Sequence, residues 1–158
     1  MTAKKSPGAG EQTIAINRQA RHNYFIEETY EAGLILVGSE VKSLRDGKAN
    51  LKDGFARIQK GEAFLLNIHI SPYPGANQFN HPPTRTRKLL LHSREIERLT
   101  GKTKERGFTL VPLRLYFKNG RAKVELGLAR GKRLYDKRET LRRKEAQREV
   151  ERSIKARH

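Results

Sequence analysis

The chain has 158 residues, of which 34 are Lys or Arg and 17 are Asp or Glu, so its formal net charge is +17. This length predicts one domain with tails and excludes a large two-domain enzyme. No stretch of the sequence approaches the ~20 apolar residues that a membrane span needs. The absence of Cys excludes disulfides, thiolate zinc sites and a cysteine nucleophile. No apolar segment follows the first lysines, so we expect no secretory signal and a cytoplasmic protein.

The positive charge is concentrated toward the C-terminus. Residues 1–12 have two basic and one acidic residue, residues 13–129 have 20 and 11, and residues 130–158 have 12 and 5. Such a field attracts polyanions and speeds encounter with them. We therefore predict a nucleic acid as partner, bound with salt-sensitive affinity. The alternative is that the charge only keeps the protein soluble.

The order of local patterns predicts a mainly β chain. Residues 1–12 lack periodicity and predict a disordered arm. Alternating or β-rich runs then mark about six strands, and a Ser followed by apolar residues at helical spacing marks two short helices. The expected strands are residues 13–16, 24–37, 55–58, 63–70, 108–117 and 122–128, and the expected helices are residues 39–44 and 93–99.

Turn residues divide these strands. Lys60-Gly61 predicts one hairpin, and Asn119-Gly120 predicts another with a type I′ turn, because both residues tolerate positive φ. Residues 71–83 contain four of the six prolines and predict a loop. Pro112 interrupts an otherwise regular strand, which indicates an edge position or a bulge.

Several strands with short turns favour a closed antiparallel barrel, because closure hides the strand edges. We predict an oligonucleotide-binding-type barrel over residues 13–129, with two or three short helices. A flat α+β sandwich is the alternative.

Residues 130–158 form a basic tail without any β pattern. Ala146, Val150 and Ile154 would make one narrow helical stripe, too small to offset the ordering entropy of an isolated helix. We predict a tail that is disordered when free and helical on a polyanionic surface. The alternative is a helix packed on the barrel through that stripe.

No pattern indicates catalysis. The five histidines lack metal-ligand spacing, and Gly47-Lys48 lacks the other residues of a phosphate-binding loop. The carboxylates of Glu27, Glu28 and Glu31 are compatible with a nuclease, but no other group converges on them. We therefore predict a protein that is not an enzyme and that needs no cofactor and no metal.

Three stretches of the sequence indicate a family more specifically than the composition does: Ile14–Asp53, Pro83–Ile96 and Gly127–Arg138. Together they resemble the SsrA-binding protein (small protein B, SmpB) family over about residues 13–158. The resemblance implies a six- to seven-stranded oligonucleotide-binding-type barrel with a flexible C-terminal tail. It also implies binding to the tRNA-like domain of transfer-messenger RNA and its delivery to stalled ribosomes in trans-translation.

The same resemblance implies how the two parts act. The barrel stands where the anticodon arm of a tRNA would be, and the tail enters the decoding centre and the empty mRNA channel of the small ribosomal subunit. Elongation factor Tu and alanyl-tRNA synthetase are implied as members of the same pathway. A structural ribosome-associated RNA-binding protein stays open as an alternative.

The family's RNA-contacting patch matches Asn17, Glu31 and Leu91 of this chain. Asn17 can donate and accept hydrogen bonds, Leu91 can pack on a base or ribose, and Glu31 can brace the patch. Any of these side chains can instead be a solvated surface residue, and Leu91 can belong to the core. Further candidates in the matching stretches carry phosphate-binding or stacking groups: Arg21, His22, Lys42, Arg45, Lys48, Asn50, Arg85, Arg87 and Lys88.

The tail carries its own family residues. The family often has His before Asp-Lys-Arg, and here Tyr135 holds that place, which preserves aromatic stacking but not an imidazolium. The tail residues that the resemblance assigns to the ribosome are Gly131, Lys132, Tyr135, Asp136, Lys137 and Arg138.

Overall fold

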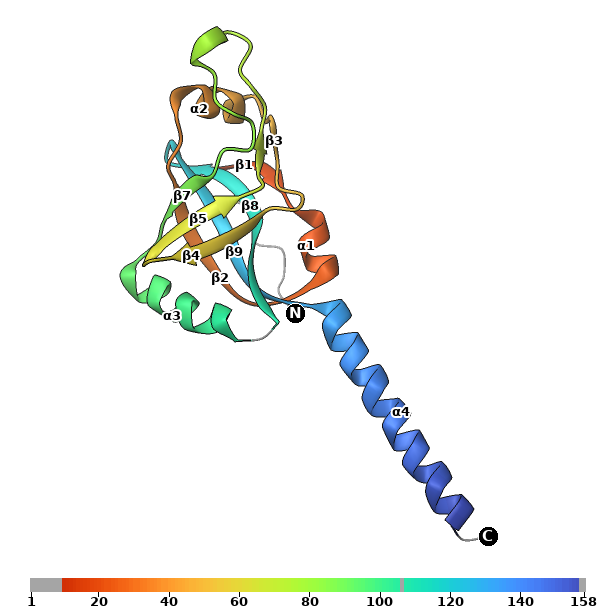
Figure 1. Cartoon of the computed structure of the whole chain (residues 1–158). Coiled ribbons are helices and arrows are strands. Elements are labelled where there is room, and N and C mark those ends of the chain that lie inside the picture. Colours follow the sequence, from red (N-terminus) through yellow and green to blue (C-terminus); the bar gives the residue numbers. More distant parts are fainter. Residues whose placement is uncertain (1–9, 106, 157–158) are drawn as a thin grey trace.

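The largest element of the fold is an antiparallel sheet of seven strands in the order β1-β8-β4-β5-β7-β2-β9 (Figure 1). The computed structural model describes residues 10–105 and 107–156, except for the side chains of residues 77, 133–141 and 155–156. The mainly β prediction is confirmed. The strands of this sheet are β1 (Glu11–Ile16), β2 (Tyr24–Leu34), β4 (Phe55–Gln59), β5 (Glu62–Leu66), β7 (Arg87–Leu90), β8 (Phe108–Lys118) and β9 (Arg121–Gly131).

Both predicted hairpins are present. In the turn between β8 and β9, Asn119 has φ 51° and Gly120 has φ 79°. Lys60 and Gly61, between β4 and β5, have φ 51° and 75°. Positive φ at both central positions is the type I′ geometry, whose twist matches that of the flanking strands.

Strand pairing links six strands in a ring. β8 pairs with β4 on one side and with β9 on the other, and β1 lies along β8 as the seventh strand. Pro112 is therefore in a central strand and not at an edge. The β8–β9 register shifts between Pro112 and Arg114, so the predicted bulge accommodates the ring that cannot donate to the ladder.

The core lies inside this ring. Side chains from β5, β8 and β9 alternate inward, among them Leu65, Leu115 and Leu126, all 0% exposed. A smaller cluster forms on the outer side of β8 and β9, where Ala20 packs against Val111 and other apolar residues. This second cluster fixes a short helix against the sheet.

That helix, α1 (Arg18–Asn23), was not predicted, because its one buried residue is Ala20 and the segment shows no helical stripe. The other two short helices were predicted. They are α2 (Gly38–Arg45) and α3 (Ser93–Lys104), and α3 continues past the expected end at Leu99. In Figure 1 α2 and α3 lie at opposite ends of the sheet.

A two-stranded sheet and a loop complete the α2 end. β3 (Ala49–Asn50) pairs with β6 (His69–Ile70), and the predicted loop after β6 contains the short 3-10 helix η1 (Asn77–Phe79). In Figure 1 this loop rises beside α2. We call α2, residues 46–53 and residues 68–87 together the α2 end.

The basic tail is helix α4 (Lys132–Ala156) in the structure. It continues from β9 and projects away from the sheet (Figure 1). Val150 and Ile154 of the apolar stripe are 58% and 53% exposed, so the stripe does not pack on the strands. Across the described part of the chain, no helix combines the length and the apolar content that crossing a bilayer requires.

Candidate nucleic-acid interface

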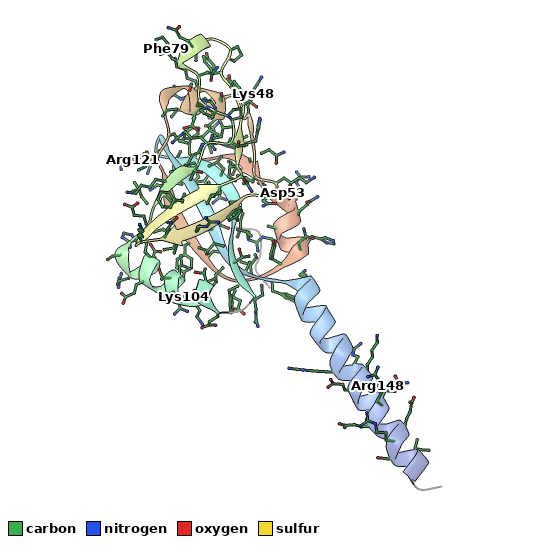
Figure 2. The ribbon with its side chains drawn as sticks, viewed as in Figure 1. Lys48, Asp53, Phe79, Lys104, Arg121 and Arg148 are labelled. Atoms are coloured by element: carbon green, nitrogen blue, oxygen red, sulfur yellow. The ribbon has the colours of Figure 1, made fainter. Side chains whose placement is uncertain are left out.

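Half of the predicted RNA-contacting side chains belong to the α2 end. Lys42 and Arg45 lie on α2, and Lys48 and Asn50 follow it, all four exposed. Figure 2 shows Lys48 at the same end of the molecule as Phe79, which is on the loop after β6. The structure therefore brings together cationic side chains that can contact phosphates without any acidic partner described for them.

A buried ion pair holds this end in place. Glu40 of α2 is fully buried and accepts hydrogen bonds from Arg87 Nε at 2.5 Å and from Arg85 Nη2 at 2.6 Å. The backbone N–H of Val37 also donates to Glu40, at 3.0 Å. Burial raises the pKa of the Glu40 carboxyl, but the three donors together hold this pKa below its usual value. The carboxylate is charged and fully paired, as a buried charge must be.

Arg87 corrects one prediction. Its side chain is 0% exposed and, besides Glu40, donates to the carbonyls of Ile68 at 2.9 Å and Pro83 at 3.0 Å. The guanidinium is thus enclosed by the protein and is not available to a phosphate. Alternation along β7 turns Arg87 inward, whereas Lys88 points outward.

Arg85 is both paired with a buried carboxylate and partly exposed. It pairs with Glu40, but its side chain is still 31% exposed at the surface of the α2 end. Lys88 is more exposed, at 43%, and pairs with Glu62 at 3.3 Å. Both side chains lie at the surface as predicted, each with an acidic partner.

Two serines and a histidine join α2 to the loop. The ring nitrogens of His81 lie 2.8 Å from Ser39 Oγ and 2.9 Å from the carbonyl oxygen of Ile70. Because a carbonyl only accepts, Nε2 of His81 donates to it, and in the neutral ring Nδ1 accepts from Ser39. Ser43 Oγ donates to the carbonyl of Ser71 at 2.6 Å. These bonds fix the start and the end of the loop against α2.

Asn17 lies between the α2 end and α1. Its side-chain amide donates to the carbonyls of Pro112 at 3.0 Å and Leu51 at 3.4 Å, and its backbone N–H donates to Leu113. The side chain is half-buried, so its amide nitrogen is used to join residues 46–53 to β8. Its carbonyl oxygen carries no described bond.

Arg21 and His22 are exposed on α1, where Arg21 supplies a second area of positive charge. The guanidinium of Arg21 lies 3.8 Å from Glu125 on β9. Lys132, at the start of α4, donates to the carbonyl of Arg21 at 3.1 Å and lies 5.1 Å from the ring centre of Phe25. The base of α4 is thereby held next to α1.

Glu31 is paired with two neighbours on β8. It accepts a 2.5 Å hydrogen bond from the hydroxyl of Tyr116 and pairs with Lys118 at 3.3 Å. The Tyr116 hydroxyl, with Lys118, holds the pKa of the Glu31 carboxyl below its usual value. Burial and the same carboxylate raise the pKa of Tyr116. A carboxylate paired in this way orients its neighbours and does not repel a phosphate as a free charge would.

Leu91 is partly buried and packs against the main core, whereas Leu90 is 55% exposed. Gly131 ends β9, opposite Tyr24. The predicted tail residues Tyr135, Asp136, Lys137 and Arg138 are on the backbone of α4, and their side chains lie outside the described residues.

Sequence reasoning missed Glu40, the residue that positions the site. A detectable signal was present, because Glu40 is three residues after Val37 and this is the spacing at which a carboxylate accepts from the backbone of an N-cap residue. We expected this helix to begin at Ser39, but the Ser39 hydroxyl bonds to His81, and the helix begins at Gly38 with Val37 as its N-cap. Within the described residues, no three His, Asp or Glu side chains gather as metal ligands.

A family model described as SmpB protein matches residues 14–156 of this chain. The chain belongs to the SmpB family. It is 66% identical to the SsrA-binding protein of Geobacillus thermodenitrificans, covering 92% of this chain and 94% of that protein. It is 64% identical to the SsrA-binding protein of Desulforudis audaxviator, covering 92% of this chain and 95% of that one.

A solved structure agrees with this assignment to the SmpB family. The matching chain comes from a structure described as "tmRNA-SmpB: a journey to the center of the bacterial ribosome". It shares 55% identity with this chain, with a TM-score of 0.64, over 74% of this chain and 82% of the other. The resemblance seen in the three sequence stretches is thus confirmed at the level of the family.

Proposed function

We propose that this chain binds the tRNA-like domain of transfer-messenger RNA and is required for the stable association of that RNA with stalled ribosomes in trans-translation. The observation that carries this proposal is the 66% identity to an SsrA-binding protein over 92% of the chain. The exposed cations of the α2 end and of α1 supply the electrostatic attraction that RNA binding needs. In this role the chain is an adaptor and not an enzyme.

The ring of paired strands is, in this proposal, a closed oligonucleotide-binding-type barrel. Pairing of β8 with both β4 and β9 supports closure, because a flat open sheet would leave β9 without a second neighbour. The body takes the place of a tRNA anticodon arm. A rigid body is suited to that task, since its cations keep fixed spacings.

The RNA-contacting side chains in this proposal are the Lys, Arg, Asn and His members of the predicted set that are exposed or half-buried. Arg87 supports Arg85 and α2 through the shared Glu40 carboxylate, Glu31 holds Tyr116 and Lys118 of β8, and Leu91 packs against the core. The direct contacts are made by Asn17, Arg21, His22, Lys42, Arg45, Lys48, Asn50, Arg85 and Lys88.

The tail acts separately from the body. In this proposal the tail after β9, which was predicted to begin at residue 130, is disordered in the free protein and becomes helical in the decoding centre and the empty mRNA channel, where it contacts small-subunit RNA. The projection of α4 away from the sheet supports this division (Figure 1). Elongation factor Tu and alanyl-tRNA synthetase act in the same pathway, in the bacterial cytoplasm.

The proposal is tested by sequencing the RNA that copurifies with the tagged chain from bacterial cells. Transfer-messenger RNA should be enriched far above tRNA and ribosomal RNA. Ribosomal RNA recovered from all ribosomes in constant proportion would contradict the proposal and favour a structural ribosomal component.

The division of labour has its own test. Changing Tyr135, Asp136, Lys137 and Arg138 together to Ala should leave affinity for the tRNA-like domain nearly unchanged but abolish peptidyl transfer to the alanine of the RNA. In the matched variant Arg45→Gln/Lys48→Gln, the primary defect should be a lower affinity for the tRNA-like domain. Equal loss of both activities in both variants would refute the separation of body and tail.

A further inference from the structure

Phe79 is an apolar ring that the fold leaves in water. It is 81% exposed, the highest fraction among the exposed large apolar side chains of the described residues. It ends η1 on the loop after β6, and Figure 2 shows it at the outermost part of the α2 end. A fully exposed Phe contributes little to the core, so its place at a loop tip is better explained by what it can contact.

The loop that carries Phe79 is braced at its base. The side chain of Asn80 bonds twice to the backbone of Tyr73: its Oδ1 accepts from the N–H at 3.0 Å, and its Nδ2 donates to the carbonyl at 2.7 Å. Within the loop, the N–H of Phe79 donates to the carbonyl of Ala76 at 2.9 Å. The ring is therefore presented by an ordered turn, which lowers the entropy cost of binding.

The base of the loop is in turn joined to α2. The Ser39–His81 and Ser43–Ser71 bonds hold both of its ends, and the ammonium of Lys42 lies 5.5 Å from the ring centre of Tyr73. The position of Phe79 is thus set relative to the cations of α2. The loop therefore holds Phe79 at a fixed distance from these cations, although the ring itself makes no core contact.

The charged side chains at the same end as Phe79 favour RNA over a protein as its partner. Lys42, Arg45 and Lys48 are exposed at this end, together with the carboxylates of Asp46 and Asp53. An apolar pocket of a protein partner would have to desolvate these charges, whereas RNA offers phosphates to them. Every nucleobase also offers a π-face, and aromatic side chains stack on bases that are not paired in a helix.

We propose that Phe79 stacks on an unpaired base of the bound RNA while Lys42, Arg45 and Lys48 contact the neighbouring phosphates. The proposal rests on RNA binding by this chain and adds to it a stacking contact at the tip of the α2 end. The base lies in a loop or a bulge of the RNA, because a base inside an A-form helix has no free face.

The chain contains no Trp, which makes a direct test possible. In the Phe79→Trp variant the only indole is at the loop tip, and stacking on a base quenches its emission. Titration with a transcript of the tRNA-like domain should quench the emission with the same midpoint as a gel-shift titration. In the control variant Glu97→Trp the indole is on the exposed surface of α3, at the opposite end of the sheet from α2 (Figure 1), and its emission should not change.

Affinity supplies a second readout. Phe79→Ala should weaken binding roughly 5- to 150-fold, the range that base stacking on an aromatic side chain gives. Phe79→Tyr should keep affinity within about twofold, because it keeps the ring. Phe79→Leu should be as weak as Phe79→Ala, since it is apolar without a π-face. None of these variants should change the melting temperature or the salt dependence of binding.

The outcomes separate this inference from the proposed function. If the unaltered chain does not bind the transcript, both are overturned. If it binds, but the Phe79→Trp emission is unchanged and Phe79→Ala binds normally, the stacking contact alone is overturned. Equal affinities of Phe79→Leu and Phe79→Tyr would also overturn it, because they would indicate apolar packing and not stacking.

Discussion

The α2 end and helix α4 are both rich in cations, but they hold those cations in opposite ways. At the α2 end, the surface cations are held in place by a buried ion pair, Glu40 and Arg87, and by side-chain hydrogen bonds such as Ser39–His81. On α4, every described side chain from Arg142 to Ile154 is exposed, and the described contact with the body is made by Lys132 in the first turn. The comparison teaches that charge density alone does not define an RNA-binding surface. Packing decides whether the cations keep a fixed spacing or follow the shape of a partner.

The largest effect should come from breaking the buried pair. Arg87→Ala leaves the Glu40 carboxylate buried without its closest partner, which should lower the free energy of unfolding by about 3–5 kcal/mol. Urea unfolding monitored by circular dichroism measures this change. Arg85→Ala is the matched control and should cost less, since Arg85 is 31% exposed. If Arg87→Ala is no more harmful than Arg85→Ala, the pair does not hold the α2 end.

A smaller effect should follow from crowding the place where residues 46–53 join the body. A Cβ added at Gly54 would be 2.4 Å from Ile68 Cδ1 and 3.1 Å from the carbonyl oxygen of Leu51. Gly54→Ala should therefore lower the free energy of unfolding by about 1–3 kcal/mol, the usual cost of overpacking. Gly38→Ala is the control, because a Cβ there has nothing within 4 Å. Equal stability of the two variants in thermal unfolding would contradict this prediction.

The contribution of the ion pair between Glu28 on β2 and Arg98 on α3 to stability should depend on pH. Hydrogen bonds from Arg98 and Tyr30 lower the pKa of Glu28 to about 2 from a usual value of 4.5. Because the folded-state pKa is depressed, the contribution is fully present above pH 4.5 and is lost as pH falls toward 2. Glu28→Gln should thus be less stable than the unaltered chain at neutral pH and approach it in acid.

Urea unfolding at a series of pH values measures that difference. Arg98→Gln should give a similar profile, since it removes the main donor. A stability difference that stays constant from neutral pH down to strong acid would show that titration of Glu28 is not its cause.

The smallest effect on stability is expected on α4. Changing the exposed residues Arg142, Arg143 and Lys144 to Gln should alter the free energy of unfolding by less than about 0.5 kcal/mol. The same variant should reduce the salt dependence of ribosome association by about 0.7–0.9 in log–log slope for each phosphate that α4 no longer neutralises. Lys60→Gln/Arg121→Gln, on the exposed turns, is the control and should change neither quantity. A marked drop in stability would mean that α4 packs on the body.

Much of the local structure was predictable. The two hairpins follow from Asn119-Gly120 and Lys60-Gly61, because a type I′ turn needs residues that accept positive φ, whatever their surroundings. Helices α2 and α3 follow from short-range spacing, and the bulge follows from Pro112, which cannot donate to a ladder. The three family stretches were sufficient to indicate the SmpB family.

The site was less predictable, because its chemistry depends on distant contacts. Arg85, Arg87 and Lys88 look alike in the sequence, but only Arg87 turns inward, to meet Glu40 from 47 positions away. Asn17 looks like a free polar group until β8 brings the Pro112 carbonyl to its amide. Nothing in the sequence around Glu31 indicates that the Tyr116 hydroxyl will donate a hydrogen bond to its carboxylate.

The sequence by itself determined the charge of this protein, its turns and its family, since these depend on composition, on the conformational limits of single residues and on the order of short motifs. Tertiary structure alone decided which cations are buried, which are exposed and which carboxylates they meet. The physical reason is that burial and pairing are properties of strand register and of packing between segments far apart in the chain. That is why Phe79, inconspicuous in the sequence, stands out only when the folded loop leaves its ring in water.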